Sequence, residues 1–236
     1  MNMNFLAIIP ARGGSKRIPR KNIRPFAGQP IINYSIEVAK ELSLFDEIMV
    51  STEDGEIAEL AREAGAVVPF LRSRKNADDF STITDVVKEV LETYRRHAIH
   101  FDVVCCILPT APFITPRRLM EGFEKLQASN FDAVIPVQRF QYPIQRALQV
   151  DGITGRVSMV HPENLRVRSQ DLPYRYHDCG QFYWARVASF EKEGTFFAPN
   201  AGYIELSAWE VQDIDEEEDW ILAEHKFETL RHIKGI

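Results

Sequence analysis

The sequence predicts an α/β fold with a doubly wound, mostly parallel sheet. Two observations predict it: short apolar runs alternate with helical periodicities, and they do so in βαβα order. The size of the chain also supports this fold, because 236 residues, 45% of them hydrophobic, can bury one large core. We therefore expect a single domain over residues 1–236, with ligands bound outside the carboxyl ends of the strands.

The first half of the chain supplies most of these elements in order. Strands are predicted at residues 6–9, 48–51, 67–69, 103–108 and 133–137. Pro30 suits the first position of a helix over residues 31–42. A second helix is expected between Asp54, its N-terminal signal, and Gly65, which stops it. A third has an apolar stripe over residues 86–94, and a fourth opens at Thr115 and Pro116.

The alternation breaks down between residues 138 and 178, where turn residues and prolines interrupt the pattern. This segment predicts an excursion from the sheet. The core is expected to resume with strands at residues 180–184, 203–206 and 211–214, followed by a C-terminal helix that buries Trp220.

A basic loop follows the first predicted strand directly. We define it as residues 12–24, which include Arg12, Lys16, Lys21 and the adjacent glycines Gly13 and Gly14 but no acid. Glycines let backbone N–H groups approach a ligand, and the cations neutralise it, so the loop predicts a polyphosphate site. It matches neither the Walker pattern nor the dinucleotide fingerprint. A solvated basic surface loop is the alternative.

Charge is segregated along the chain rather than uniform. The net charge of −6 argues against general nucleic-acid binding, yet the basic loop still favours small anions. No apolar run has the length of a signal peptide or a membrane span, so we expect a cytoplasmic protein that binds no membrane. The three cysteines show no metal-ligand spacing, and Cys105 and Cys106 are expected in the core.

Two carboxylates near the C-terminus are candidate metal ligands. Asp213 and Asp215 project to one face of an extended chain and would suit Mg²⁺. Alternatively, Asp215 caps the last helix, with the following glutamates in its first turn. The pattern favours neither, and both can hold for Asp215.

The residues Ile9-Pro10-Ala11-Arg12-Gly13-Gly14-Ser15-Lys16-Arg17-Ile18-Pro19 and Lys21-Asn22 resemble the opening motif of the cytidylyltransferases that activate nonulosonic acids with CMP. The resemblance implies a nucleotide-diphospho-sugar transferase-like fold, CTP as substrate and Mg²⁺ as cofactor. It favours metal binding by Asp213 and Asp215. It implies catalysis by Lys21, Arg12 and Asp215, and nucleotide binding by Arg12, Gly13, Gly14, Ser15, Lys16, Lys21, Asn22, Arg72 and Thr82.

The same resemblance extends to a sugar side. It implies contacts from Leu108, Thr110, Gln170, Tyr176 and His177. Leu108 and Ala111 stand where the sialic-acid branch has polar residues, and the segment from Ser169 to Phe182 is most similar to the pseudaminic-acid branch. The residues alone leave three structural alternatives open. These are an ordinary strand-to-helix turn at residues 108–112, a surface arginine at Arg72 and a structural histidine at His177.

In relatives, the excursion packs against a second subunit and completes its active site, so the resemblance implies a homodimer. Legionaminic, N-acetylneuraminic and Kdo acids are the alternative substrates. A non-catalytic nucleotide-binding protein is the alternative class.

Overall fold

The computed structural model describes residues 3–234. A seven-stranded sheet has the order β11-β6-β10-β5-β1-β4, with β9 paired to β6. The strands are β1 Phe5–Pro10, β4 Glu47–Ser51, β5 Val103–Ile107, β6 Ala133–Arg139, β9 Tyr176–Asp178, β10 Phe182–Arg186 and β11 Ala201–Glu205. Five of the seven point the same way, because only β9 and β10 run against their neighbours. The predicted mostly parallel α/β sheet is therefore confirmed.

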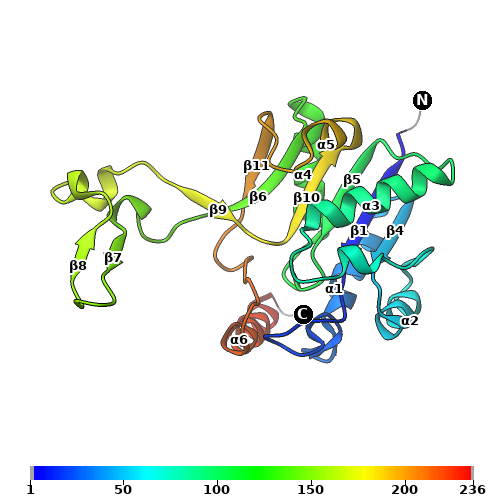
Figure 1. The fold of residues 1–236 in the computed structure, drawn as a ribbon, viewed down its shortest axis with the longest axis horizontal. Coiled ribbons are helices and arrows are strands. Elements are labelled where there is room, and N and C mark those ends of the chain that lie inside the picture. Colours follow the sequence, from blue (N-terminus) through cyan, green and yellow to red (C-terminus); the bar gives the residue numbers. More distant parts are fainter. Residues whose placement is uncertain (1–2, 235–236) are drawn as a thin grey trace.

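Helices cover both faces of this sheet, as doubly wound folds require (Figure 1). They are α1 Ile31–Leu42, α2 Gly55–Glu63, α3 Ile83–Arg96, α4 Pro116–Ala128, α5 Val187–Glu193 and α6 Glu217–Lys234. Alternation along β5 divides the core: Cys105 packs with α1, α2 and α4, and Cys106 with α3 and α5. Both thiols are fully buried, as predicted.

Local signals explain where several helices begin and end. Asp54 accepts a hydrogen bond from the N–H of Ile57 at 3.1 Å, and Gly65 follows α2 with φ +93°. Thr82 and Asp85 form a capping box at the start of α3. Thr115 caps α4, with Pro116 at its first position. These predicted boundaries of α2 and α4 are confirmed.

Two predicted strands are absent from the sheet that the structure describes. Val67 forms a single bridge to Met49 instead of a strand over residues 67–69. Residues 211–214 are extended but pair with no strand. Val68 in the first segment and Val211 and Ile214 in the second are buried against the core, and burial alone does not make a ladder. The first segment lies along the outer edge of β4, where only Val67 forms a bridge.

The excursion leaves the body as a long arm, which we define as residues 140–175 (Figure 1). Its stem is the antiparallel pair β6–β9, and its tip is the hairpin β7 Leu148–Val150 and β8 Val157–Met159. A second short hairpin, β2 Pro25–Phe26 and β3 Gln29–Pro30, follows the basic loop. No helix within residues 3–234 combines the length and apolarity needed to cross a membrane.

Candidate active site

A cavity of about 330 Å³ opens beyond the carboxyl ends of β1 and β5. The basic loop, the start of α3 and the segment after β5 line it. Its lining holds five cationic side chains, Arg12, Lys16, Arg17, Lys21 and Arg72, against one carboxylate, Asp215. An excess of positive charge in a concave site attracts a small polyanion. The position is where open α/β sheets bind ligands, as the sequence predicts.

Four of the five cations at this cavity pair with carboxylates of the same chain. Asp79 pairs with Arg12 at 3.0 Å and also with Lys16, and the Lys16 contact holds the pKa of Asp79 below its usual range. Asp215 Oδ1 lies 2.8 Å from Arg17 Nη2 and 3.5 Å from Lys21 Nζ. An anion that enters the cavity therefore competes with Asp79 and Asp215 for the same cations.

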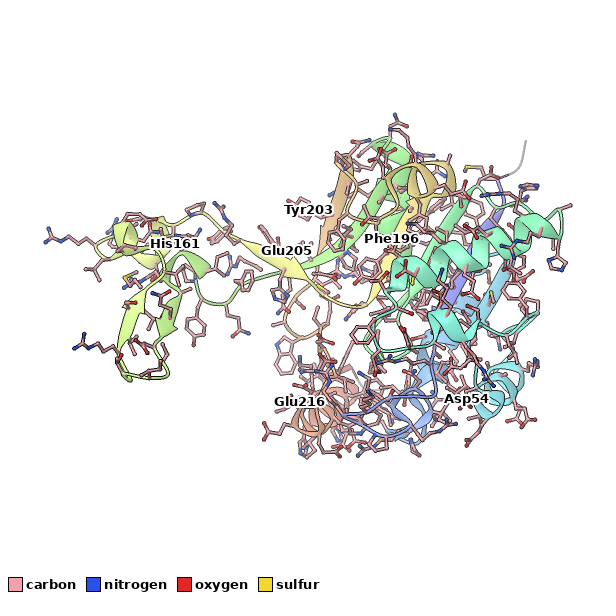
Figure 2. The ribbon with its side chains drawn as sticks, in the orientation of Figure 1. Asp54, His161, Phe196, Tyr203, Glu205 and Glu216 are labelled. Carbon is pink, nitrogen blue, oxygen red and sulfur yellow. The ribbon has the colours of Figure 1, made fainter. Side chains whose placement is uncertain are left out.

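The shape of the basic loop is maintained by acids that follow β4. Arg20, in the left-handed region at φ +55°, donates two hydrogen bonds to Asp54 at 2.5 and 3.1 Å and one to Glu56 at 2.5 Å. Figure 2 shows Asp54 at the start of α2. The Arg20 pair also holds the pKa of Asp54 below its usual range. Contacts within the chain thus fix the course of the loop at Arg20.

The two adjacent glycines serve the loop itself in this structure. The Gly13 N–H donates to Glu53 Oε1 at 2.8 Å, and a Cβ on Gly13 would lie 2.4 Å from Asp54 Oδ2. Gly14 has open space around it, and neither glycine lines the cavity. The close approach of Asp54 therefore requires glycine at position 13, and nucleotide binding by Gly13 and Gly14 stays a prediction.

The predicted nucleotide residues Ser15, Asn22, Arg72 and Thr82 do line the cavity. Asn22 is buried and donates to the carbonyl of Arg12 at 2.9 Å, which fixes the start of the basic loop. Thr82 caps α3 as well as facing the cavity.

Arg72 is buried, with 7% of its surface exposed, so the surface-arginine alternative is wrong. Its Nε donates to Ser51 Oγ at 3.1 Å, and its Nη2 donates to the Ser51 carbonyl. Burial lowers the pKa of Arg72, although the charges of Glu53 and Glu89 oppose that shift. A buried guanidinium held mainly by neutral groups favours an anionic or strongly polar ligand beside it.

The acidic loop, which we define as residues 206–216, brings Asp215 to the cavity, while Asp213 is not among the lining residues. Ile214 is 1% exposed, and the acids on either side of it flank this buried anchor. Lys21 Nζ donates to the Ile214 carbonyl at 2.5 Å. Desolvation and the charge of Asp215 both raise the pKa of Asp213, so the two carboxylates repel one another.

The helix-capping role proposed for Asp215 is wrong. Asp219 Oδ2 accepts the N–H groups of Asp215 at 3.0 Å and Glu216 at 2.9 Å, so Asp219 caps the start of α6. Glu216 marks that start in Figure 2. The Asp215 side chain instead pairs with Arg17 and Lys21.

On the predicted sugar side, Leu108 and Thr110 line the cavity. Leu108 is held in place because its carbonyl accepts from Ser35 Oγ at 2.7 Å and its N–H donates to the Gln181 carbonyl at 2.7 Å. Ala111 instead packs in the main core at 2% exposure, so only Leu108 provides an apolar wall.

Three predicted sugar residues lie outside this cavity within one chain. Gln170 is on the arm, in a short 3₁₀ turn. Tyr176 and His177 are in β9, where the His177 ring lies 4.8 Å from that of Phe140. Their sugar contacts stay a prediction.

For several residues the sequence does not predict the role that they have at the site. Asp79, Glu53 and Asp54 hold the basic loop, and Arg17 pairs with Asp215. Glu53 and Asp54 directly follow a predicted strand, and this position indicates that they lie near the basic loop. The carboxyl ends of neighbouring parallel strands meet at one edge of the sheet. Within residues 3–234, no group of three or more His, Cys, Asp or Glu side chains is arranged to hold a metal ion.

Comparison with known proteins finds similarity along nearly the whole chain. A sequence profile described as cytidylyltransferase matches residues 6–228. The pseudaminic acid cytidylyltransferase of Campylobacter jejuni is 40% identical over 217 residues, 92% of this chain and 93% of that protein. The CMP-N,N'-diacetyllegionaminic acid synthase of Legionella pneumophila is 33% identical over 232 residues, 96% of this chain and 97% of that protein.

A solved structure of CMP:2-keto-3-deoxy-manno-octonic acid synthetase, complexed with CTP, has the same fold. It superposes with a TM-score of 0.68 at 17% identity, and the match covers 97% of this chain and 99% of that one.

We predict that Asp79→Asn strengthens the binding of inorganic pyrophosphate. The amide removes the charge that competes for Arg12 and Lys16, so the dissociation constant measured by calorimetry falls by up to about fivefold. Glu59→Gln, on the exposed face of α2, changes the net charge equally and is expected to leave binding unaltered. Weaker binding in Asp79→Asn would mean that Asp79 orders the site rather than competing for it.

Proposed function

The chain belongs to the cytidylyltransferase family, and on that premise we propose that it transfers CMP from CTP to the anomeric hydroxyl of pseudaminic acid, a nine-carbon α-keto acid sugar. The anomeric oxygen forms a bond to the α-phosphorus while the bond from that phosphorus to the bridging oxygen breaks, and pyrophosphate leaves. The observation that carries the proposal is the cavity with five cations and one carboxylate. That balance suits a triphosphate, whose reaction needs positioning and charge stabilisation.

The residues that line the cavity have different roles in this reaction. Arg12, Ser15 and Lys16 bind the triphosphate, and Lys21 stabilises charge at the reacting phosphate. Asn22 and Arg72 face the nucleoside. Lys21 is suited to its role because the Ile214 carbonyl fixes its ammonium while leaving it at the cavity wall.

Asp213 and Asp215 are the residues that would hold Mg²⁺. Burial and then the charge of Asp215 raise the pKa of Asp213, and a divalent cation would offset both effects. Two carboxylates suffice, because Mg²⁺ usually completes its shell with water and substrate phosphates. When bound, the metal would neutralise charge on the departing pyrophosphate. The buried free thiols at 105, 106 and 179 fit the reducing cytoplasm, where we place the reaction.

Substrate choice follows from the apolar wall at Leu108. A polar sugar tail placed there would lose water without gaining a partner, so a deoxygenated, methyl-ended tail is preferred. The higher identity to the pseudaminic acid enzyme than to the legionaminic acid enzyme also supports this branch.

We expect pseudaminic acid to rank first in a panel with legionaminic, N-acetylneuraminic and Kdo acids, each with CTP and Mg²⁺. The kcat/KM measured by pyrophosphate release should exceed that for N-acetylneuraminic acid by about ten- to a hundredfold. If legionaminic acid ranked first, only the choice of branch would be wrong. Absence of pyrophosphate release with every sugar would favour the non-catalytic alternative.

Asp215→Asn is expected to reduce turnover by about a hundredfold or more. Loss of a group that only hydrogen-bonds to a metal ligand already costs about ten- to a hundredfold, and Asp215 is proposed as a ligand itself. The fold should persist because Asp219 caps α6, so far-UV circular dichroism stays unchanged. Glu216→Gln, an exposed neighbour, is the control and should retain full activity. Normal turnover of Asp215→Asn at limiting Mg²⁺ would remove Asp215 from the proposed metal site.

We also propose that two copies pair through their arms, each arm contributing to the site of the partner subunit. One face of the tip hairpin is apolar: Leu148 lies opposite Met159 and Val150 opposite Val157 in the strand register. Val150 is 69% exposed and Val157 58% exposed, while Gln149 and Ser158 bond to each other on the other face. Exposed apolar surface of this kind favours association.

Sedimentation velocity tests the dimer. The unmodified chain is expected at twice the monomer mass, and a variant with Val150→Asp and Val157→Asp at the monomer mass, because carboxylates on the apolar face would have to be desolvated. Gln149→Asp adds a charge to the opposite face and should stay dimeric. A monomeric unmodified chain would contradict the proposal.

A further inference from the structure

A lysine of α6 has its ammonium inside the acidic loop. Lys226 Nζ donates to the carbonyls of Ala208 at 2.9 Å and Val211 at 2.6 Å, and to Gln212 Oε1 at 3.2 Å. An ammonium has three donors, and these three acceptors account for all of them. Burial lowers the pKa of Lys226, and no carboxylate charge offsets that shift. The charge is therefore held by neutral oxygens of one loop.

The acidic loop needs such a donor. It contains no helix or strand, so its carbonyls lack the partners that a regular element would supply. Two other contacts hold its first part: Arg118 donates twice to Glu210, at 2.7 and 2.9 Å, and Gln181 donates to the Glu210 carbonyl. Lys226 is the contact from α6, at residues 208–212.

One side chain connects this contact to the acid pair. Gln212 accepts from Lys226 through Oε1, and its Nε2 donates to the carbonyl of Asp213 at 3.2 Å. Beyond Asp213, the next carbonyl, that of Ile214, is held by Lys21. Asp213 therefore lies between two fixed carbonyls: Lys226 holds that of Val211, and Lys21 holds that of Ile214. Lys226 itself is not among the residues that line the cavity.

We propose that Lys226 is a positioning residue that fixes residues 208–212 and thereby orients Asp213 towards the metal, an inference that rests on the metal role proposed for Asp213. The ammonium acts through the loop backbone and the Gln212 amide, without contact to substrate. Removing it leaves two backbone carbonyls without this donor, and the loop then samples other arrangements in which the acid pair is less often aligned.

The test is Lys226→Met, which keeps an unbranched side chain one atom shorter and removes the ammonium. Trp209 lies in the acidic loop beside Ala208 and is 53% exposed, so its fluorescence reports on loop mobility without metal or substrate. Acrylamide quenching assigned to Trp209, by subtraction of Trp209→Phe proteins, is expected to rise. The Mg²⁺ concentration for half-maximal rate is expected to rise about tenfold, while the KM for CTP changes less than about twofold.

Two further variants keep the test decisive. Lys192→Met removes an exposed lysine of α5 whose partner is Glu193, and it should alter neither measurement. Lys226→Gln retains a donor and replaces the methionine variant if that protein does not fold; it should show a smaller change in the same direction.

Unchanged Trp209 quenching, or raised quenching with an unaltered Mg²⁺ requirement, would overturn the positioning role. Neither result touches the proposed function, whose own failure would be the absence of pyrophosphate release from the unmodified chain.

Discussion

The site depends on one small apolar joint between two oppositely charged loops. Ile18 lies among the cations of the basic loop, Ile214 lies between the two acids, and each is 1% exposed. Both pack in a core formed with Phe26 and Trp220. Burial of apolar surface is not screened by salt, whereas exposed ion pairs are. The loops therefore stay together when their ion pairs are exchanged for contacts with a ligand.

Around this joint the protein keeps its own carboxylates where an anion would bind. Asp79 and Asp215 neutralise cations at the cavity, and acids after β4 hold the loop from below. A preformed site lowers the cost of ordering side chains on binding. The same arrangement makes affinity a competition between substrate phosphates and internal carboxylates.

Most of the fold could be predicted from local pattern. The apolar runs around Ile8 and Cys106 and the helix signals at Asp54 and Thr115 each depend on neighbours in sequence, so the elements they mark were placed correctly. The strands predicted at residues 67–69 and 211–214 are absent because short apolar runs do not reveal whether a buried segment forms a ladder.

At the site, the sequence by itself determined the charges and their order: a basic loop after β1 and an acid pair before the last helix. Only the tertiary structure decided which partners these charges have. It assigned helix capping to Asp219 rather than Asp215, buried Arg72 beside Ser51, and placed the Lys226 ammonium inside the acidic loop. Hydrogen bonds and burial depend on groups far apart in the chain, and spacing along one strand or helix carries no information about them.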